Sequence, residues 1–237
     1  AMTPEGTVNR AALPAIFNPE DLNALEAALF LKDETEGSTV HILTMGPPRA
    51  ADIIRDAIFR GADGGYLLTD RKFAGSDTLA TSYALSCALR KIQPDVIVAG
   101  RQAIDGDTAQ VGPQGAEKLG LTQVTYAEEI LNVDEKNRSI TVKRHIDGGV
   151  ETVEGPLPIV ITVNGSAAPC RPRNAKLVMK FKRALGAQEK APAPACHPEG
   201  VSALSYPELY EKRPYLNISE WSVCLLYTSP SPETSLH

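Results

Sequence analysis

Short apolar runs that alternate with helix-like segments constrain this chain more than any other feature. The run 95–100 (DVIVAG) has almost no polar alternation, which is typical of a parallel strand covered on both faces. Similar runs at 39–45 and 66–68 are each followed by apolar residues at helical spacing. Strands that alternate with helices at this interval imply right-handed βαβ units. The sequence therefore predicts an α/β fold with a doubly wound, Rossmann-like parallel sheet.

Helix boundary signals refine this prediction. Asn18 can cap a first helix, with Pro19 at its first position and Asp21 completing a capping box. A third helix, capped by Ser76 or Asp77, is expected to carry the apolar residues Leu79, Tyr83, Leu85 and Leu89. After the loop that follows residue 100, a fourth helix is expected to start near Asp107.

After residue 122, strand signals replace the alternation of strands and helices. Strand-like segments at 123–133, 139–145, 150–153 and 159–163 are divided by the turn signals 134–137 and 147–149. An antiparallel section should therefore extend the parallel core. Residues 173–185 are expected to form a basic helix, and the Pro- and Ala-rich stretch that follows to form a linker.

Composition excludes several classes of function. The net charge of −5 argues against a general nucleic-acid binder. No stretch approaches the roughly 20 apolar residues of a membrane span, and the first residues contain no apolar signal region. We therefore expect a cytoplasmic location. The four cysteines include no C-x-x-C pair, so we expect no metal site, and no side chain stands out as a catalytic nucleophile or acid–base group.

The loop 100–112 (GRQAIDGDTAQVG) is the segment most suggestive of chemistry. It follows the most apolar strand and opens a helix, so free N–H groups there could seat a phosphate. Gly106 and Gly112 would permit close backbone approach, and Asp105 and Asp107 would cap the helix or face sugar hydroxyls. Without a G-x-G-x-x-G or Walker pattern, a simple capped βα loop is an equally good reading.

Four segments resemble the beta subunits of electron-transfer flavoproteins: AGRQAIDGDTAQVGPQ, FNPEDLNALEAAL, TMGPPRAADIIRDAIFRGAD and CRPRNAKLVMKFKRA. The resemblance spans about 18–223 and implies a doubly wound fold that holds AMP or FAD. It also implies an alpha subunit that carries the electron-transferring FAD. The fourth segment resembles the one that bears the family's partner-recognition loop. DGDTAQVGP and AGSDTLATSYAL are more similar to the electron-bifurcating subgroup, which favours FAD over AMP and NADH as hydride donor.

Carried over residue by residue, the resemblance places cofactor contacts on three segments and adds two residues before the third helix. The implied contacts are Asn18, Pro19, Glu20, Asp21, Met45, Gly46, Asp77, Thr78, Gly100, Arg101, Gln102, Ala103, Ile104, Asp105, Gly106, Asp107, Thr108, Ala109, Gln110 and Val111. Asp77 and Thr78 would lie near the flavin ring or the nicotinamide, although a plain helix cap explains them as well. The implied partners are the alpha subunit of a heterodimer, an acyl-CoA dehydrogenase or similar redox protein, and a low-potential acceptor such as ferredoxin or flavodoxin.

The resemblance also divides the chain. Residues 1–185 are expected to form the nucleotide- or FAD-binding domain, without the strand that normally opens the family's fold. Residues 186–223 would form a linker and part of an arm for the alpha subunit, and 224–237 depart from the family as an atypical, non-native tail. Two rival functions stay open: an ordinary electron carrier with structural AMP, and an adenine-nucleotide-binding α/β enzyme. The latter should show a glycine-rich phosphate loop near its first strand.

Overall fold

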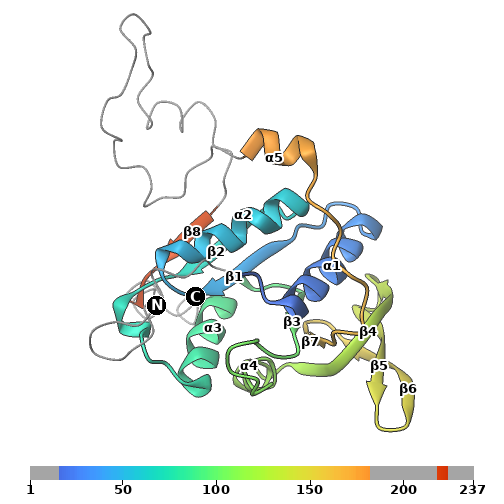
Figure 1. The fold of residues 1–237 in the computed structure, drawn as a ribbon. Coiled ribbons are helices and arrows are strands. Elements are labelled where there is room, and N and C mark those ends of the chain that lie inside the picture. The colour runs from blue at the N-terminus through green and yellow to red at the C-terminus, as the bar shows by residue number, and fades with distance from the viewer. Residues whose placement is uncertain (1–15, 182–217, 224–237) are drawn as a thin grey trace, which may run out of the picture.

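The computed structural model describes residues 16–181 and 218–223 (Figure 1). Their helices and strands alternate through the first half, and strands dominate the second half. In chain order the elements are α1 (Pro19–Glu34), β1 (His41–Met45), η2 (Pro48–Ala50), α2 (Ala51–Arg60), β2 (Gly64–Leu68), η3 (Arg71–Phe73), α3 (Thr78–Ile92), β3 (Val96–Gly100), α4 (Val111–Leu119), β4 (Thr122–Asp134), β5 (Ser139–Ile146), β6 (Gly149–Pro156), β7 (Ile159–Val163), α5 (Ala175–Phe181) and β8 (Ile218–Trp221).

The strands form two sheets. β1, β2 and β8 are parallel neighbours in a three-stranded sheet. The five-stranded sheet has the order β3-β7-β4-β5-β6, in which β3, β7 and β4 are parallel and β5 and β6 are antiparallel. The α/β fold with a parallel core and an antiparallel extension is confirmed, with the parallel strands divided between the two sheets.

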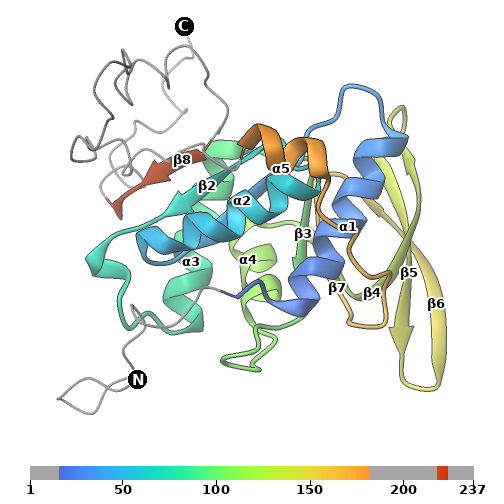
Figure 2. The same ribbon diagram turned by 45° about the horizontal axis from the view of Figure 1, so that its top comes forward.

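Helices cover both faces of the strands and join the two sheets. Leu67 of β2 packs in the same core cluster as α1 and α2, whereas its neighbour Leu68 packs against α3. Successive strand residues point to opposite faces, so α1 and α2 lie on one face and α3 on the other (Figure 2). α1 serves both cores: Leu25 and Leu29 belong to the cluster with α2, and Ala24 to the cluster of the five-stranded sheet.

The buried face of α3 is not made of its large apolar residues. Leu79 and Tyr83, two of the apolar residues that this helix was expected to carry, are 58% and 46% exposed. The buried positions are instead small: Ser82, Ala84, Ser86 and Ala88. Ser82 Oγ donates to Gln114 Oε1 of α4 at 2.9 Å. Small residues and this polar contact let the two helices pack closely, which periodicity of large apolar residues does not reveal.

The hairpins agree with the prediction. The turn 134–137 joins β4 to β5, and Asn137 N donates to Asp134 Oδ1 at 3.0 Å. The next turn joins β5 to β6, with Gly148 at φ +90°. The predicted strand 159–163 is β7, whose five residues are all buried.

A segment without regular structure, residues 164–174, leads from β7 across α1 to α2 and into α5 (Figure 1); we name it the strap. Asn23 Nδ2 donates to Ala167 O and Ala168 O, and Asn174 N donates to Phe59 O at 2.7 Å. The predicted basic helix is α5 within the described residues. Residues 182–185, the predicted linker 186–200, the tail 224–237 and the chain start lie outside them. None of the helices in the described part has the length and apolar character needed to cross a membrane.

Candidate functional site

The carboxyl ends of β3 and β7 lie level at one edge of the five-stranded sheet, beside Ala127 in the middle of β4, which continues to Asp134. Gly100 at the end of β3 pairs with Val163 of β7, and Val163 pairs with Ala127 of β4. The loop 101–110 leaves the sheet at this edge and leads into α4. Doubly wound folds bind ligands at such an edge. The loop therefore lies where the sequence placed it.

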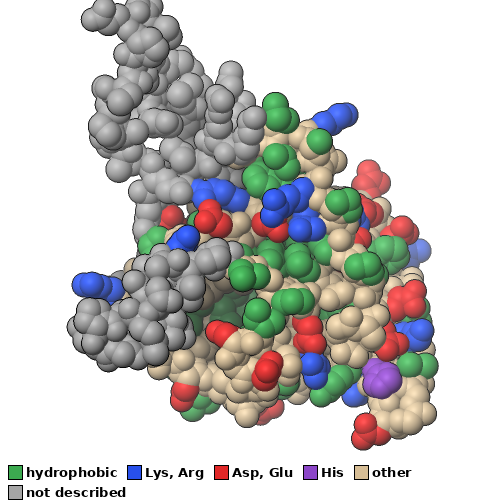
Figure 3. All heavy atoms as spheres, viewed as in Figure 1, with side chains coloured by type: hydrophobic (Ala, Val, Ile, Leu, Met, Phe, Trp, Pro, Cys, Tyr) green, Lys and Arg blue, Asp and Glu red, His purple; other side chains and the backbone are tan. Residues whose placement is uncertain are grey.

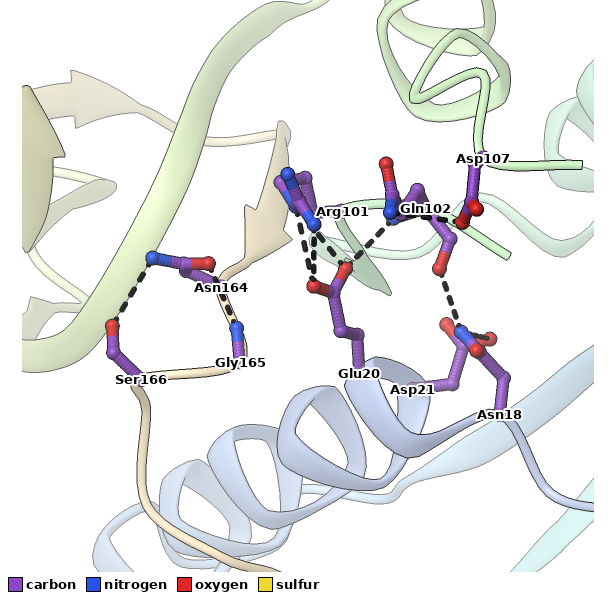
Figure 4. A network of polar contacts seen from close by, with 9 residues as sticks. All are labelled: Asn18, Glu20, Asp21, Arg101, Gln102, Asp107, Asn164, Gly165 and Ser166. Atoms are coloured by element: carbon purple, nitrogen blue, oxygen red, sulfur yellow. Dashed lines mark hydrogen bonds and ion pairs between the residues drawn. The ribbon is translucent and has the colours of Figure 1, made fainter. Parts of the chain in front are cut away.

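Three side chains at the start of α1 hold the end of β3, in a set of contacts that we name the α1–β3 junction (Figure 4). Asp21 Oδ1 accepts a hydrogen bond from Gly100 N at 2.7 Å, and Glu20 Oε2 accepts one from Gln102 N at 3.0 Å. Asn18 Nδ2 donates to Gln102 O at 2.8 Å. The junction therefore satisfies the last N–H of β3, which points away from β7, and backbone groups of Gln102 in the loop that follows.

Arg101 completes the junction. Its backbone N–H donates to Val163 O, and its guanidinium pairs with Glu20 at 2.9 Å. The same guanidinium lies over the ring of Tyr126, with 5.6 Å from Cζ to the ring centroid. All three N–H groups of 100–102 and the Arg101 charge are thus engaged within the protein. A bound phosphate would need donors further along the loop.

Burial shapes the first turn of α1. Loss of solvent raises the pKa of the Asp21 carboxyl, although hydrogen bonds from Asn18 and Gly100 favour its charged form. Asn18 holds the predicted N-cap position and Pro19 follows it, but Asn18 makes no side-chain capping bond. Its Nδ2 donates instead to Asp21 Oδ2 at 2.9 Å. Its Oδ1 is buried and has no hydrogen-bond partner among the described residues.

The middle of the loop has an unusual backbone. Asp107 and Ala109 have φ values of +47° and +52°, in the left-handed region that residues with a side chain seldom adopt. Asp107 N donates to Ala103 O, and Asp107 Oδ1 accepts from Gln102 Nε2, both at 3.0 Å. Left-handed residues among ordinary ones turn successive N–H groups toward one concave side, an arrangement that binds anions in other proteins.

The helix after the loop starts later than predicted. α4 begins at Val111 rather than near Asp107, because the left-handed residues at 107 and 109 cannot continue a helix. Its N-cap residue Gln110 makes no side-chain capping bond. Within the described part of the chain, no hydrogen bond uses the N–H groups of 108–112. These groups form the free donors of the candidate site.

The starts of α3 and α4 lie side by side. Thr78 Oγ1 donates to Gln110 Oε1 at 3.0 Å. Asp77 caps α3, as predicted, and its Oδ1 accepts from Ala80 N at 2.8 Å. The structure therefore brings the predicted 77–78 pair to the end of the predicted loop, 32 residues away in sequence.

Two predicted contacts stand apart from this group. Met45 packs with the core cluster of Leu68 and α3, and Gly46 N donates to Leu68 O at 3.0 Å. Among the described residues, no hydrogen bond or ion pair joins Met45 or Gly46 to 100–111. Their contact with a cofactor stays a prediction.

The loop glycines differ in their surroundings. A Cβ at Gly106 would meet no atom within 4 Å. A Cβ at Gly112 would lie 2.7 Å from Thr162 Cγ2 of β7. Gly112 therefore allows α4 to pack on the sheet, which is a different reason from the close ligand approach that the sequence suggested. Gly106 leaves open space beside the loop.

Sequence reasoning missed the residues that surround the junction. Tyr126 has φ +57° at a bulge of β4, a strained position for a bulky residue. After β7, Asn164 Nδ2 donates to Ser166 Oγ, and Asn164 Oδ1 accepts from Gly165 N (Figure 4). The Asn-Gly-Ser turn after a buried strand was a usable signal. Nothing in the sequence marked Tyr126.

Family comparison follows this geometry. Residues 5–192 match the model of the electron transfer flavoprotein domain. The chain belongs to this family. Among its relatives are Protein FixA of Azorhizobium caulinodans, 55% identical over 66% of this chain, and the electron transfer flavoprotein subunit beta of Megasphaera elsdenii, 47% identical over 75%. Subunit CarD of the caffeyl-CoA reductase-Etf complex of Acetobacterium woodii is 49% identical over 66%.

These flavoprotein relatives are longer than the part matched here. The chain spans 57% of the Azorhizobium FixA, 59% of CarD and 67% of the Megasphaera subunit. The resemblance to electron-transfer flavoprotein beta subunits is confirmed, including the subgroup whose members occur in reductase complexes. Within the described residues, no group of three or more His, Cys, Asp or Glu side chains could hold a metal ion.

Proposed function

We propose that this chain is the beta subunit of a heterodimeric electron-transfer flavoprotein and that the 100–111 loop holds FAD. The proposal rests above all on the free N–H groups of 108–112 at the joined starts of α3 and α4. The partial positive charge of a helix start favours a phosphate there. Relatives that are subunits of reductase complexes support the redox class.

The residues present fit a pyrophosphate held by backbone groups. The residues from Thr108 to Gly112 offer N–H donors, and Gly106 leaves room beside them. Arg101 supplies no free charge, because Glu20 neutralises it. Asp105 would face sugar hydroxyls, and Gln110, held by Thr78, would orient the phosphate.

When bound, FAD supplies the redox chemistry: it accepts a hydride from NADH and releases electrons one at a time. The protein then binds and orients the cofactor and lets electrons pass to the flavin of the alpha subunit. The onward acceptors would be an acyl-CoA dehydrogenase or similar protein, and ferredoxin or flavodoxin if the subunit bifurcates electrons. Lys and Arg side chains around α2 and α5 lie among acidic ones on the face shown in Figure 3, and Arg60 and Arg173 both pair with Asp56, so this face is mixed in charge.

The absorbance spectrum of this chain purified with its alpha partner tests the proposal. We expect two flavins per heterodimer and bleaching of both by NADH. One flavin with one AMP would instead indicate an ordinary carrier with a structural nucleotide. A heterodimer that contains no flavin would refute both redox functions.

A variant of the loop tests the location. Gly106→Val should abolish cofactor retention and leave the melting temperature within about 2 °C of wild type, because the new side chain meets only the open space of the site. Gly149→Val, in a distant hairpin where a Cβ likewise meets no atom within 4 Å, serves as the matched control and should retain the cofactor. Unchanged nucleotide content in Gly106→Val would remove the loop from the site.

A further inference from the structure

Every carboxylate oxygen of the α1–β3 junction already has a donor within the protein. Glu20 Oε1 accepts from Arg101 Nη2 at 2.9 Å, and Oε2 accepts from Gln102 N at 3.0 Å. Asp21 Oδ1 accepts from Gly100 N, and Oδ2 accepts from Asn18 Nδ2. Arg101 Nε also lies 3.2 and 3.3 Å from the two Glu20 oxygens, so a ligand hydroxyl or amide would have to displace an existing donor to bind Glu20. Each Asp21 oxygen accepts one hydrogen bond within the protein.

The junction also leaves no room for a ligand between its two halves. A Cβ at Gly100 would lie 2.7 Å from Asp21 N and 2.8 Å from the carbonyl carbon of Glu20. The first turn of α1 is therefore in direct contact with the backbone of β3. Only a residue without a side chain fits at position 100.

We propose that Glu20 and Asp21 are positioning residues, which fix the 100–102 segment and do not touch the cofactor. This inference rests on the proposed function of the loop, and it replaces the direct contact that family resemblance implied for these two residues. The carboxylates hold the start of the loop on α1. The N–H groups of 108–112 are thereby presented to the cofactor's phosphates.

Amide hydrogen exchange of the full chain tests whether the carboxylates hold residues 100–102 while the N–H groups of 108–112 contact the cofactor. We expect the amides of Gly100 and Gln102 to exchange slowly without any ligand, because carboxylates accept from both. FAD or AMP should slow exchange at 108–112 and leave Gly100 and Gln102 unchanged. Fast exchange at these two amides that slows only on adding FAD or AMP would overturn the proposal. If neither compound binds, the proposed function fails, while the exchange without ligand still tests the junction.

Charge removal at Glu20 gives the second test. In Glu20→Gln, the amide nitrogen would face the donors of Arg101 and Gln102, so exchange at Gln102 should accelerate. FAD and AMP should both bind about tenfold more weakly, the factor expected for loss of one charge-assisted hydrogen bond. Glu34→Gln, at the exposed far end of α1, is the matched control and should bind as wild type.

The two readouts separate positioning from contact. Weaker binding in Glu20→Gln with unchanged exchange at Gly100 and Gln102 would mean that the carboxylate contacts the ligand, and would overturn the proposal. Unchanged binding with faster exchange would also overturn it, because the junction would then not govern the loop. Asp21→Asn repeats the test at Gly100; if it does not fold, the Glu20 variant decides.

Discussion

Acidic side chains fasten α1 at two places, and the two fastenings work differently. At its start, the α1–β3 junction directs two carboxylates to the backbone N–H groups of Gly100 and Gln102, where the loop begins. Further along, Glu26 and Asp33 hold the guanidinium of Arg171 in the strap, at 2.9 and 2.8 Å, and Glu26 also accepts from Arg171 N at 2.8 Å. Arg60 adds to the second fastening by donating to Arg171 O. The first fastening sets the position of a loop, and the second ties two parts of the fold together.

The pKa shifts of the two fastenings point in opposite directions. Loss of solvent dominates at Asp21 and raises its pKa. At Glu26, burial also works against ionisation, but the hydrogen bonds and the charge of Arg171 outweigh it and lower the pKa. Ionised Asp21 therefore costs stability, while ionised Glu26 adds to it. A costly charge at the candidate site and a favourable one away from it agree with a functional role for the junction.

A side chain added at Gly100 in the α1–β3 junction should cause the largest loss of stability. Gly100→Ala would force a Cβ against the backbone of α1, which cannot yield as a flexible side chain can. We expect a loss of about 2–3 kcal/mol in the free energy of unfolding, measured with urea. Gly106→Ala, where the Cβ meets open space, should stay within about 0.5 kcal/mol. Equal stabilities of the two variants would show that the junction is looser than the structure indicates.

Loss of the contacts between α1 and Arg171 of the strap should cause the next largest loss of stability. Arg171→Gln removes a guanidinium that binds two carboxylates, and it leaves the partly buried Glu26 with the backbone N–H of residue 171 but without a charged partner. We expect a loss of about 1–2 kcal/mol by thermal or urea unfolding. Arg171→Lys keeps the charge but not the planar fork, so its loss should be intermediate. A Lys variant as damaging as Gln would mean that fork geometry, rather than charge, stabilises the strap.

Much of the fold followed from local signals in the sequence. The buried strand 95–100, the cap at Asp77 and both hairpin turns depend on neighbours in the chain, and the structure has them as predicted. The buried face of α3 was not predicted, because Ser82 is buried by a partner on α4 and not by its own apolarity. Helix contact between distant segments is not encoded in the spacing of one of them.

The candidate site was predictable in place but not in mechanism. The loop 100–112 could be found from its strand and glycines. The late start of α4 could not be predicted, because nothing in the amino-acid sequence required a left-handed backbone at Asp107 and Ala109. The engagement of Glu20 with Arg101 was equally hidden, since the two residues are 81 positions apart. A role that depends on a contact between residues far apart in the sequence can be assigned only from the three-dimensional structure.

Acidification should change the stability contributions of Glu26 and Asp21 in opposite directions. Because the folded pKa of Glu26 lies below its ordinary 4.5, its contribution is present above that pH and is lost as pH falls through the folded value. The stability advantage of wild type over Glu26→Gln should therefore shrink on acidification. Asp21 has a folded pKa above its ordinary 3.8, so its destabilising charge is lost as pH falls toward 3.8. The stability of wild type should therefore rise relative to that of Asp21→Asn. Urea unfolding from pH 7 to 3.5 measures both; slopes of the same sign would contradict the comparison.

The smallest effect should come from an ion pair that has neither burial nor a backbone partner. Arg138 Nη2 lies 2.8 Å from Asp95 Oδ1, and the two side chains are 58% and 69% exposed. Solvent screens such a pair, and the ordering of two side chains offsets most of its attraction. Asp95→Asn should therefore change the free energy of unfolding, measured with urea, by no more than about 0.5 kcal/mol. A loss as large as that of Arg171→Gln would show that opposite charges alone, without enclosure or bridging, stabilise this fold, and the contrast drawn between the fastenings of α1 would lose its physical basis.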